Sequence, residues 1–218
     1  AGFTHIAYQL EPIAAALDYE QRVEKETIAL VVDIGGGTSD FTVIRLNPER
    51  SAQSDRSADI LATTGVHIGG TDFDRLLDLA TVMPYLGYKH VGTGGRIVPS
   101  SVFFDLSSWH LIHQAYMRKA MHFAKELWTD YTDQALHRRL MDALEEQHGH
   151  RMLASVEAAK IACSISGDDA LVDLDFLGHG PSEHLGATVT VPVMADTVQQ
   201  ALAQVVQCAQ LCVQRSGF

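Results

Sequence analysis

The fold of this chain is decided by the stretch Val31-Val32-Asp33-Ile34-Gly35-Gly36-Gly37-Thr38-Ser39-Asp40-Phe41. An apolar strand ends at Asp33, three glycines turn the chain, and Asp40 opens the next strand. Three consecutive glycines let backbone N–H groups approach an anion, and Thr38 adds a hydroxyl. The turn brings both aspartates to one end of a hairpin, where carboxylates can hold a hydrated Mg²⁺ against a phosphate. The pattern predicts a phosphate cradle, and its simpler interpretation is a glycine-rich turn with solubilising aspartates.

Two flanking segments support the cradle. Upstream, Glu11 lies where strand becomes helix, and Pro12 suits the first helical position. Downstream, a strand-like segment leads into Ile68-Gly69-Gly70-Thr71-Asp72-Phe73-Asp74, where Thr71 and Asp74 have the spacing of a capping box. A second glycine-led helix start can face the same anion.

These three segments, in this order and spacing, resemble the nucleotide-binding domain of the DnaK-type chaperones, the seventy-kilodalton heat-shock family within the actin-like ATPase superfamily. The resemblance is close over residues 1–79, resumes around 155–166, and is loose elsewhere. It implies an α/β fold: an actin-like ATPase (ribonuclease H-like) lobe with a mixed sheet flanked by helices, plus a smaller α+β subdomain. The sequences at 82–87 and 99–105 make the chain most similar to the divergent bacterial YegD group.

Carried over residue by residue, the resemblance implies ATP or ADP and Mg²⁺ as cofactors. Asp33 and Asp40 would stand beside the Mg²⁺ shell, and Glu11 would hold a metal-bound water. Asp33 and Glu11 would be the catalytic residues. The residues that bind or close on the phosphates would be Gly35, Gly36, Gly37, Thr38, Gly69 and Gly70.

Residues 157–164 resemble the chaperone helix that contacts adenosine. The resemblance implies that Glu157, Lys160 and Ser164 touch the ribose or base. Ile161 replaces an arginine that normally stacks on adenine, so an apolar surface remains without its cation–π contribution. Another departure is Thr71, where the chaperones usually carry glutamate. From the residues alone, an i,i+3 surface salt pair between Glu157 and Lys160 is favoured over a ligand contact.

The chain is expected to be an excised half of a nucleotide-binding domain. The family's first phosphate loop and its catalytic-site lysine are not in these residues, and its second adenosine-binding glycine loop would follow Phe218. The missing first lobe of the same protein would then be a partner, beside client or co-chaperone proteins. Phosphoryl transfer depends on groups from both sides, so this piece alone is expected to hydrolyse ATP poorly.

Composition indicates a cytoplasmic globular protein of 218 residues, 46% of them hydrophobic. No apolar run reaches the roughly 20 residues that span a bilayer, and no signal peptide is recognisable. The net charge of -11, with no basic cluster, argues against nucleic acid or anionic lipid as a partner. Cys163, Cys208 and Cys212 are predicted to be buried thiols in a reducing compartment, and a Cys208–Cys212 metal pair is less favoured. The eleven histidines complete no recognised metal spacing.

Three segments are expected: a phosphate-binding part over 1–82, an inserted helical α+β subdomain over 83–194, and a returning helix over 195–218. Residues 84–101, rich in glycine and proline, are interpreted as a linker. Periodicity predicts strands at 1–10, 28–33, 40–46, 58–64, 170–176 and 187–193. It predicts helices at 12–24, 72–81, 111–131, 133–147, 152–164 and 195–214.

Two alternatives to a chaperone ATPase stay open. The first is another actin-like ATPase, such as a filament-forming or reactivating factor, because the glycine turn is shared across that superfamily. The second is a non-catalytic scaffold or interaction module with a degraded nucleotide site. Ile161 and Thr71 favour this second alternative, together with the remodelled region at 84–105.

Overall fold

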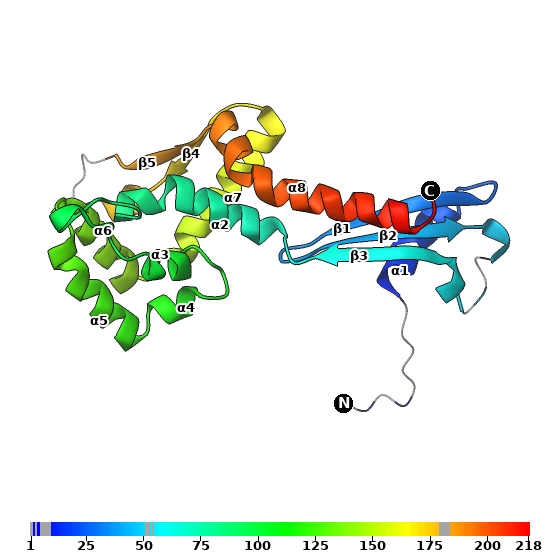
Figure 1. Ribbon diagram of the computed structural model, residues 1–218, viewed down its shortest axis with the longest axis horizontal. Helices are drawn as coiled ribbons and strands as arrows, with labels where there is room; N and C mark the ends of the chain where they lie inside the picture. Colours follow the sequence, from blue (N-terminus) through cyan, green and yellow to red (C-terminus); the bar gives the residue numbers. More distant parts are fainter. Residues whose placement is uncertain (1, 3, 5–9, 51–52, 54, 179–183) are drawn as a thin grey trace. The chain divides into compact units, whose positions relative to one another are not determined.

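The computed structural model describes the chain apart from residues 1, 3, 5–9, 51–52, 54 and 179–183 (Figure 1). The chain divides into two compact units, residues 1–70 with 201–218 and residues 71–200. Residues 71–82, which the sequence placed with the phosphate-binding segment, fold with the second unit. Leu77, Leu79 and Val82 explain this difference, because all three are buried in that unit's core.

The first unit is built on a three-stranded antiparallel sheet. Its strands are β1 (Thr27–Ile34), β2 (Ser39–Leu46) and β3 (Ile60–Val66), in the order β1-β2-β3. The strands predicted at 28–33, 40–46 and 58–64 are confirmed to within two residues. The strand expected over 1–10 falls largely outside the described residues, so the mixed sheet stays a prediction.

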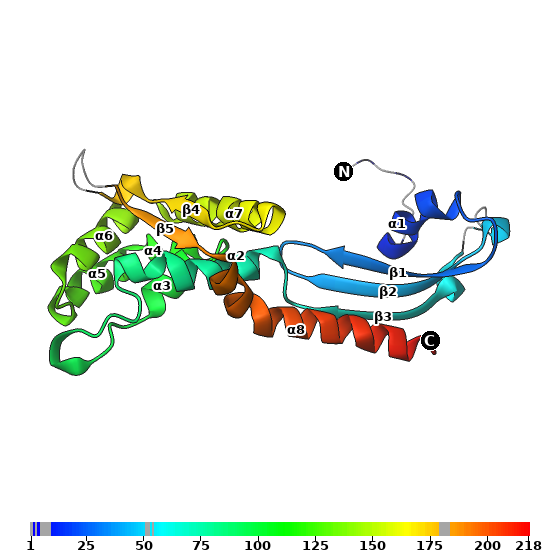
Figure 2. The ribbon, with the colours of Figure 1, turned by 90° about the horizontal axis from the view of Figure 1, so that it is seen from above.

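Alternation along the strands gives this sheet two apolar faces. Ile44 and Leu46 of β2 form one buried cluster with Ile13 and Ala16 of α1 (Glu11–Glu20). The C-terminal part of α8 (Val191–Arg215) lies on the opposite side of the strands (Figure 2), where the Cys212 thiol donates to the Phe41 carbonyl at 3.3 Å. The sheet is therefore packed between two helices.

Helix α1 starts as predicted but ends earlier. Pro12 occupies its first turn, as the sequence suggested. Its last residue is Glu20, not residue 24, because the N–H groups of Arg22 and Val23 donate to carbonyls only three residues back, so a tighter turn replaces the α-helical bonds. The Glu20 carboxylate accepts from the Asn47 backbone N–H at 2.8 Å and from Arg56.

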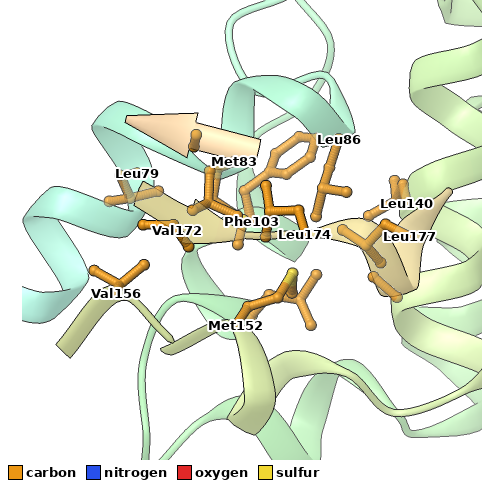
Figure 3. Packing of buried hydrophobic residues seen from close by; sticks show 14 of the residues in the cluster. Leu79, Met83, Leu86, Phe103, Leu140, Met152, Val156, Val172, Leu174 and Leu177 are labelled. Atoms are coloured by element: carbon orange, nitrogen blue, oxygen red, sulfur yellow. The ribbon is translucent and has the colours of Figure 1, made fainter. Parts of the chain in front are cut away.

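The second unit is mainly helical. Figure 3 shows its core, in which Met83, Phe103 and Leu174 come together from different segments. Its helices are α2 (Gly70–Thr81), α3 (Ser101–Leu106), α4 (Ile112–Ala115), α5 (Arg118–Glu126), α6 (Gln134–Glu145), α7 (Gly149–Ser166) and the start of α8. A two-stranded sheet pairs β4 (Ala170–Asp173) with β5 (Gly186–Val189). Short 3-10 turns are η1 (Pro48–Arg50) and η2 (Ser57–Asp59) in the first unit, and η3 (Met83–Leu86), η4 (Thr93–Gly95), η5 (Leu127–Asp130) and η6 (Asp175–Leu177) in the second.

The linker predicted at 84–101 is wrong. Leu86 is 0% exposed and Val98 is 1% exposed, so both belong to the core of the second unit. Glycine serves close packing here, since a Cβ at Gly87, whose φ is +102°, would run into the ring of Tyr131. The abundance of glycine and proline marked sharp turns inside a packed region, not a connection between subdomains.

Two other elements differ from the expectation. The helix predicted over 111–131 is broken, because Met117 is extended with φ -69° and ψ 147°. The strand predicted over 187–193 ends at Val189, and α8 begins at once. The Thr190 side chain accepts from the Val193 N–H at 3.2 Å, so it satisfies a free donor at the start of that helix. No helix in the described part of the chain is long and apolar enough to cross a membrane.

Candidate functional site

Asp33 and Asp40 face each other across the β1–β2 hairpin. They are direct cross-strand partners, and both are exposed to solvent. Neither side chain forms a hydrogen bond or an ion pair with any described residue. Like charges placed directly opposite each other destabilise a pair of strands. The hairpin therefore carries an electrostatic cost that a bound cation would relieve.

One cavity of about 420 Å³ collects the three carboxylates singled out from the sequence. Glu11 reaches it from the first turn of α1, Asp33 from the end of β1, and Asp40 from the start of β2. Its other lining residues are Pro12, Ala15, Val31, Val32, Thr42 and Thr63. The structure thus brings together residues that are far apart in the sequence.

The carboxylates of this cavity suit a hydrated cation better than a bare one. Across the residues that the structure describes, no three His, Cys, Asp or Glu side chains are grouped tightly enough to hold a metal ion by themselves. Mg²⁺ usually keeps several waters and binds through one or two carboxylates together with phosphate oxygens. The donor set of Glu11, Asp33 and Asp40 fits that mode.

The two glycine segments are in contact within the first unit. Gly35 N–H donates to the Thr38 carbonyl at 2.9 Å and closes the turn, while Gly70 N–H donates to the Gly35 carbonyl at 3.0 Å. A Cβ at Gly69 would lie 2.6 Å from the backbone nitrogen of Gly37. Only glycine permits this approach. The segment predicted to close on the phosphates therefore lies directly against the turn.

A side chain tethers the same two segments. The Ser39 hydroxyl, which is buried, donates to the Ile68 carbonyl at 2.7 Å. The capping box predicted downstream is wrong, because α2 begins at Gly70 and Thr71 lies inside the helix. Contact between the two glycine segments fixes this helix start, because the Gly70 N–H is bonded to the Gly35 carbonyl.

The residues expected to contact adenosine lie on α7, in the second unit. Glu157 and Ser164 are exposed, and Ile161 between them is 47% exposed. Lys160 instead forms an ion pair with Asp74 of α2, with 2.6 Å between Nζ and Oδ1. Burial raises the pKa of Asp74, and the hydrogen bond from Lys160 acts in the opposite direction. Lys160 thus links two helices as well as bordering the exposed face.

Sequence reasoning missed two features near these sites. Asp78 of α2 is fully buried, and neither of its oxygens has a hydrogen-bond partner among the described residues. Burial, and then the charge of Asp74, raise its pKa well above the usual range.

Thr42 and Thr63 line the carboxylate cavity with their hydroxyl oxygens 3.2 Å apart. Strand alternation could have revealed Thr42, which lies two residues beyond Asp40.

Comparison with known families places the first part of the chain. The model of the Hsp70 protein family matches residues 1–83. The matched stretch contains Glu11, both aspartates and both glycine segments. It covers less than half of the chain and ends before Glu157, Lys160 and Ser164. The Hsp70 match therefore applies to residues 1–83, and the YegD assignment stays a prediction.

Proposed function

We propose that this chain binds Mg²⁺-ATP or Mg²⁺-ADP as part of the ATPase domain of a DnaK-like chaperone with an actin-like fold. The observation that carries the proposal is the gathering of Glu11, Asp33 and Asp40 around one cavity beside a tight glycine turn. The Hsp70 match over residues 1–83 supports the same conclusion, because it includes all of these residues.

In this proposal the glycine turn holds the phosphates. Backbone N–H groups of residues 36–38 donate to β- and γ-phosphate oxygens, while Gly35, whose own N–H is held by the Thr38 carbonyl, keeps the turn closed around them. The Thr38 hydroxyl adds a further donor, and Gly69 and Gly70 close on the phosphates. Asp33 and Asp40 accept hydrogen bonds from waters of the Mg²⁺ shell. When bound, Mg²⁺ neutralises phosphate charge during phosphoryl transfer.

Glu11 and Asp33 have the catalytic roles in this proposal. Their carboxylates accept protons of bound waters in hydrogen bonds and so fix the direction of a water oxygen. Glu11 suits this role because it extends from the first turn of α1 into the cavity. An isolated turn would lack such an opposing carboxylate.

The adenosine contact is the finer part of the proposal. Glu157 and Ser164 contact the ribose or base, and Ile161 provides an exposed apolar surface for the base. Lys160 also contacts the ribose or base while it keeps its ion pair with Asp74. Membership of the YegD group, a cytoplasmic location and client or co-chaperone partners are further parts of the proposal, and they rest on the sequence resemblance.

Calorimetric titration of Mg²⁺-ADP and Mg²⁺-ATP into this chain tests the proposal. We expect binding by the unmodified chain that is lost in Asp33→Asn. Glu24→Gln is the matched control, because it removes one exposed negative charge of the same unit outside the cavity. If Asp33→Asn and Glu24→Gln bound Mg²⁺-nucleotide equally well, the carboxylates of the cavity would have no part in nucleotide binding.

A non-catalytic scaffold is the second candidate function. Ile161 favours it because it replaces the arginine that stacks on adenine in the chaperones, and Thr71 favours it because it replaces their usual glutamate. The same titration separates the two functions. Absence of Mg²⁺-nucleotide binding by the unmodified chain would make the scaffold the leading function.

A further inference from the structure

We infer that Gly65 of β3 is a positioning residue for Asp40, since its missing side chain leaves the space into which the Asp40 carboxylate extends. The inference rests on the proposed Mg²⁺-nucleotide function. It gives a second residue of β3, beside Thr63, a part in the cavity that also includes α1 and the β1–β2 hairpin.

The register of the sheet places Asp40 between two different neighbours. Asp33 lies opposite it on β1, and Gly65 lies opposite it on β3. A Cβ built on Gly65 would overlap the Oδ1 atom of Asp40 and lie 3.5 Å from its Cγ. The Asp40 carboxylate therefore occupies the place that any larger residue at position 65 would fill.

Charge explains why the carboxylate needs this space. Asp33 repels Asp40 from one side, and no described residue donates a hydrogen bond to the Asp40 side chain or pairs with it. The side chain leans toward β3, where glycine admits it. Packing against Gly65, not hydrogen bonding, therefore sets the direction of the Asp40 carboxylate, which we propose accepts hydrogen bonds from the waters around Mg²⁺.

Substitution at Gly65 should redirect the carboxylate without breaking the fold. The backbone of Gly65 does not have a positive φ, so alanine can adopt its conformation. The overlapping atom is the far end of a rotatable side chain, which can turn aside. Gly69 differs, because its Cβ would meet the backbone of the glycine turn.

An ordinary structural role for Gly65 predicts the opposite result. Glycine inside a strand weakens it, because glycine loses more conformational entropy on folding and offers no side chain to pack. If Gly65 were only a weak strand residue, Gly65→Ala would raise stability and leave ligand binding unchanged. A positioning role predicts that Mg²⁺-dependent binding falls although the fold is retained.

The experiment is a double-mutant cycle of Gly65→Ala and Asp40→Ala. The affinity for ADP is measured by calorimetry with Mg²⁺ and again with EDTA, and urea unfolding checks the fold of each variant. We expect Gly65→Ala to lower the Mg²⁺-ADP affinity about tenfold and to change the affinity in EDTA less than about twofold. In the Asp40→Ala background, Gly65→Ala should have no further effect.

Three results would overturn the inference. In the first, Gly65→Ala lowers the Mg²⁺-ADP affinity equally whether residue 40 is Asp or Ala. In the second, Asp40→Ala lowers the Mg²⁺-ADP affinity but Gly65→Ala does not, and in the third, Asp40→Ala itself leaves that affinity unchanged. Failure of the proposed function looks different, because the unmodified chain would then bind no Mg²⁺-nucleotide, and both proposals would fall together. Binding by the unmodified chain with either of the first two results would overturn only the role of Gly65.

Discussion

The guanidinium of Arg56 donates two hydrogen bonds to the carboxylate of Glu20, at 2.8 and 2.7 Å. Both side chains are almost fully buried, and they join the end of α1 to the connection between β2 and β3. Arg56 also donates to Asp59, which is paired with Arg50 at 2.6 Å. The network holds the helix that carries Glu11 against the sheet that carries the two aspartates.

Arg56→Met should destabilise the chain strongly, because it leaves Glu20 and Asp59 buried without their main partner. The expected loss in the free energy of unfolding is about 3–5 kcal/mol, measured by urea denaturation. Arg22→Met is the control, since the Arg22–Asp18 pair is 70% and 78% exposed, and such pairs contribute at most about 1 kcal/mol. Equal effects of the two substitutions would contradict a stabilising role for the buried network.

Asp33→Asn should affect stability and binding in opposite directions. Without Mg²⁺ or nucleotide, removing one of two facing charges should raise the free energy of unfolding by about 0.2–1 kcal/mol. The gain in melting temperature on adding Mg²⁺-ADP should disappear. Thermal unfolding with and without ligand measures both effects, and a variant that is less stable without ligand would contradict the repulsion.

Gly69→Ala should disrupt the contact between the two glycine segments, whereas Gly37→Ala should not. A Cβ at Gly69 would meet the backbone of Gly36 and Gly37, while one at Gly37 has no atom within 4 Å. We expect Gly69→Ala to lower the free energy of unfolding by about 1–3 kcal/mol. The expected change in Gly37→Ala is under about 1 kcal/mol. Urea unfolding without nucleotide compares them, and similar stabilities would show that the contact is not tight.

Asp78→Asn should remove a pH dependence from the second unit. Because burial raises the pKa of Asp78, the folded chain retains a proton that the unfolded chain releases above about pH 3.9. Its contribution to stability is therefore largest at low pH and is lost as pH rises toward the folded pKa. We expect Asp78→Asn to be more stable than the unmodified chain at pH 8, by about 1–3 kcal/mol.

Unfolding of the Asp78 variant should be followed at a series of pH values. The difference between the two proteins should shrink as the pH is lowered toward 4. A constant difference would mean that the carboxyl of Asp78 does not titrate in this range.

Lys160→Met should destabilise the second unit because it leaves the carboxylate of Asp74, which is 1% exposed, without its ion-pair partner. We expect faster hydrogen exchange of the backbone amides in α2 and α7, corresponding to a decrease of about 3 kcal/mol in the free energy of opening these helices. Glu157→Gln, on the exposed face of α7, should leave exchange unchanged. Unchanged exchange in Lys160→Met would show that the pair does not stabilise these helices.

The sequence predicted the pairing of Asp33 with Asp40 better than it predicted the packing of the second unit. The glycine turn and strand alternation determine the hairpin locally, so they bring Asp33 opposite Asp40. The packing of Leu86 and Val98 depends on distant partners, and local glycine and proline obscured it. The Lys160–Asp74 pair was beyond prediction for the same reason, because nothing near either residue indicates the other.

The turn between Ile34 and Ser39 also works as a spacer of fixed length. Because neighbouring residues of a strand point to opposite faces, one inserted residue would turn β2 over if the turn kept its present geometry, since the register of β2 against β1 would then shift by one residue. Asp40 would then leave the cavity, and Ile44 and Leu46 would leave the apolar cluster beneath α1. The number of residues in the turn is therefore as strict a condition for the carboxylate site as their identity, and a single insertion that shifted the register would remove Asp40 from the cavity.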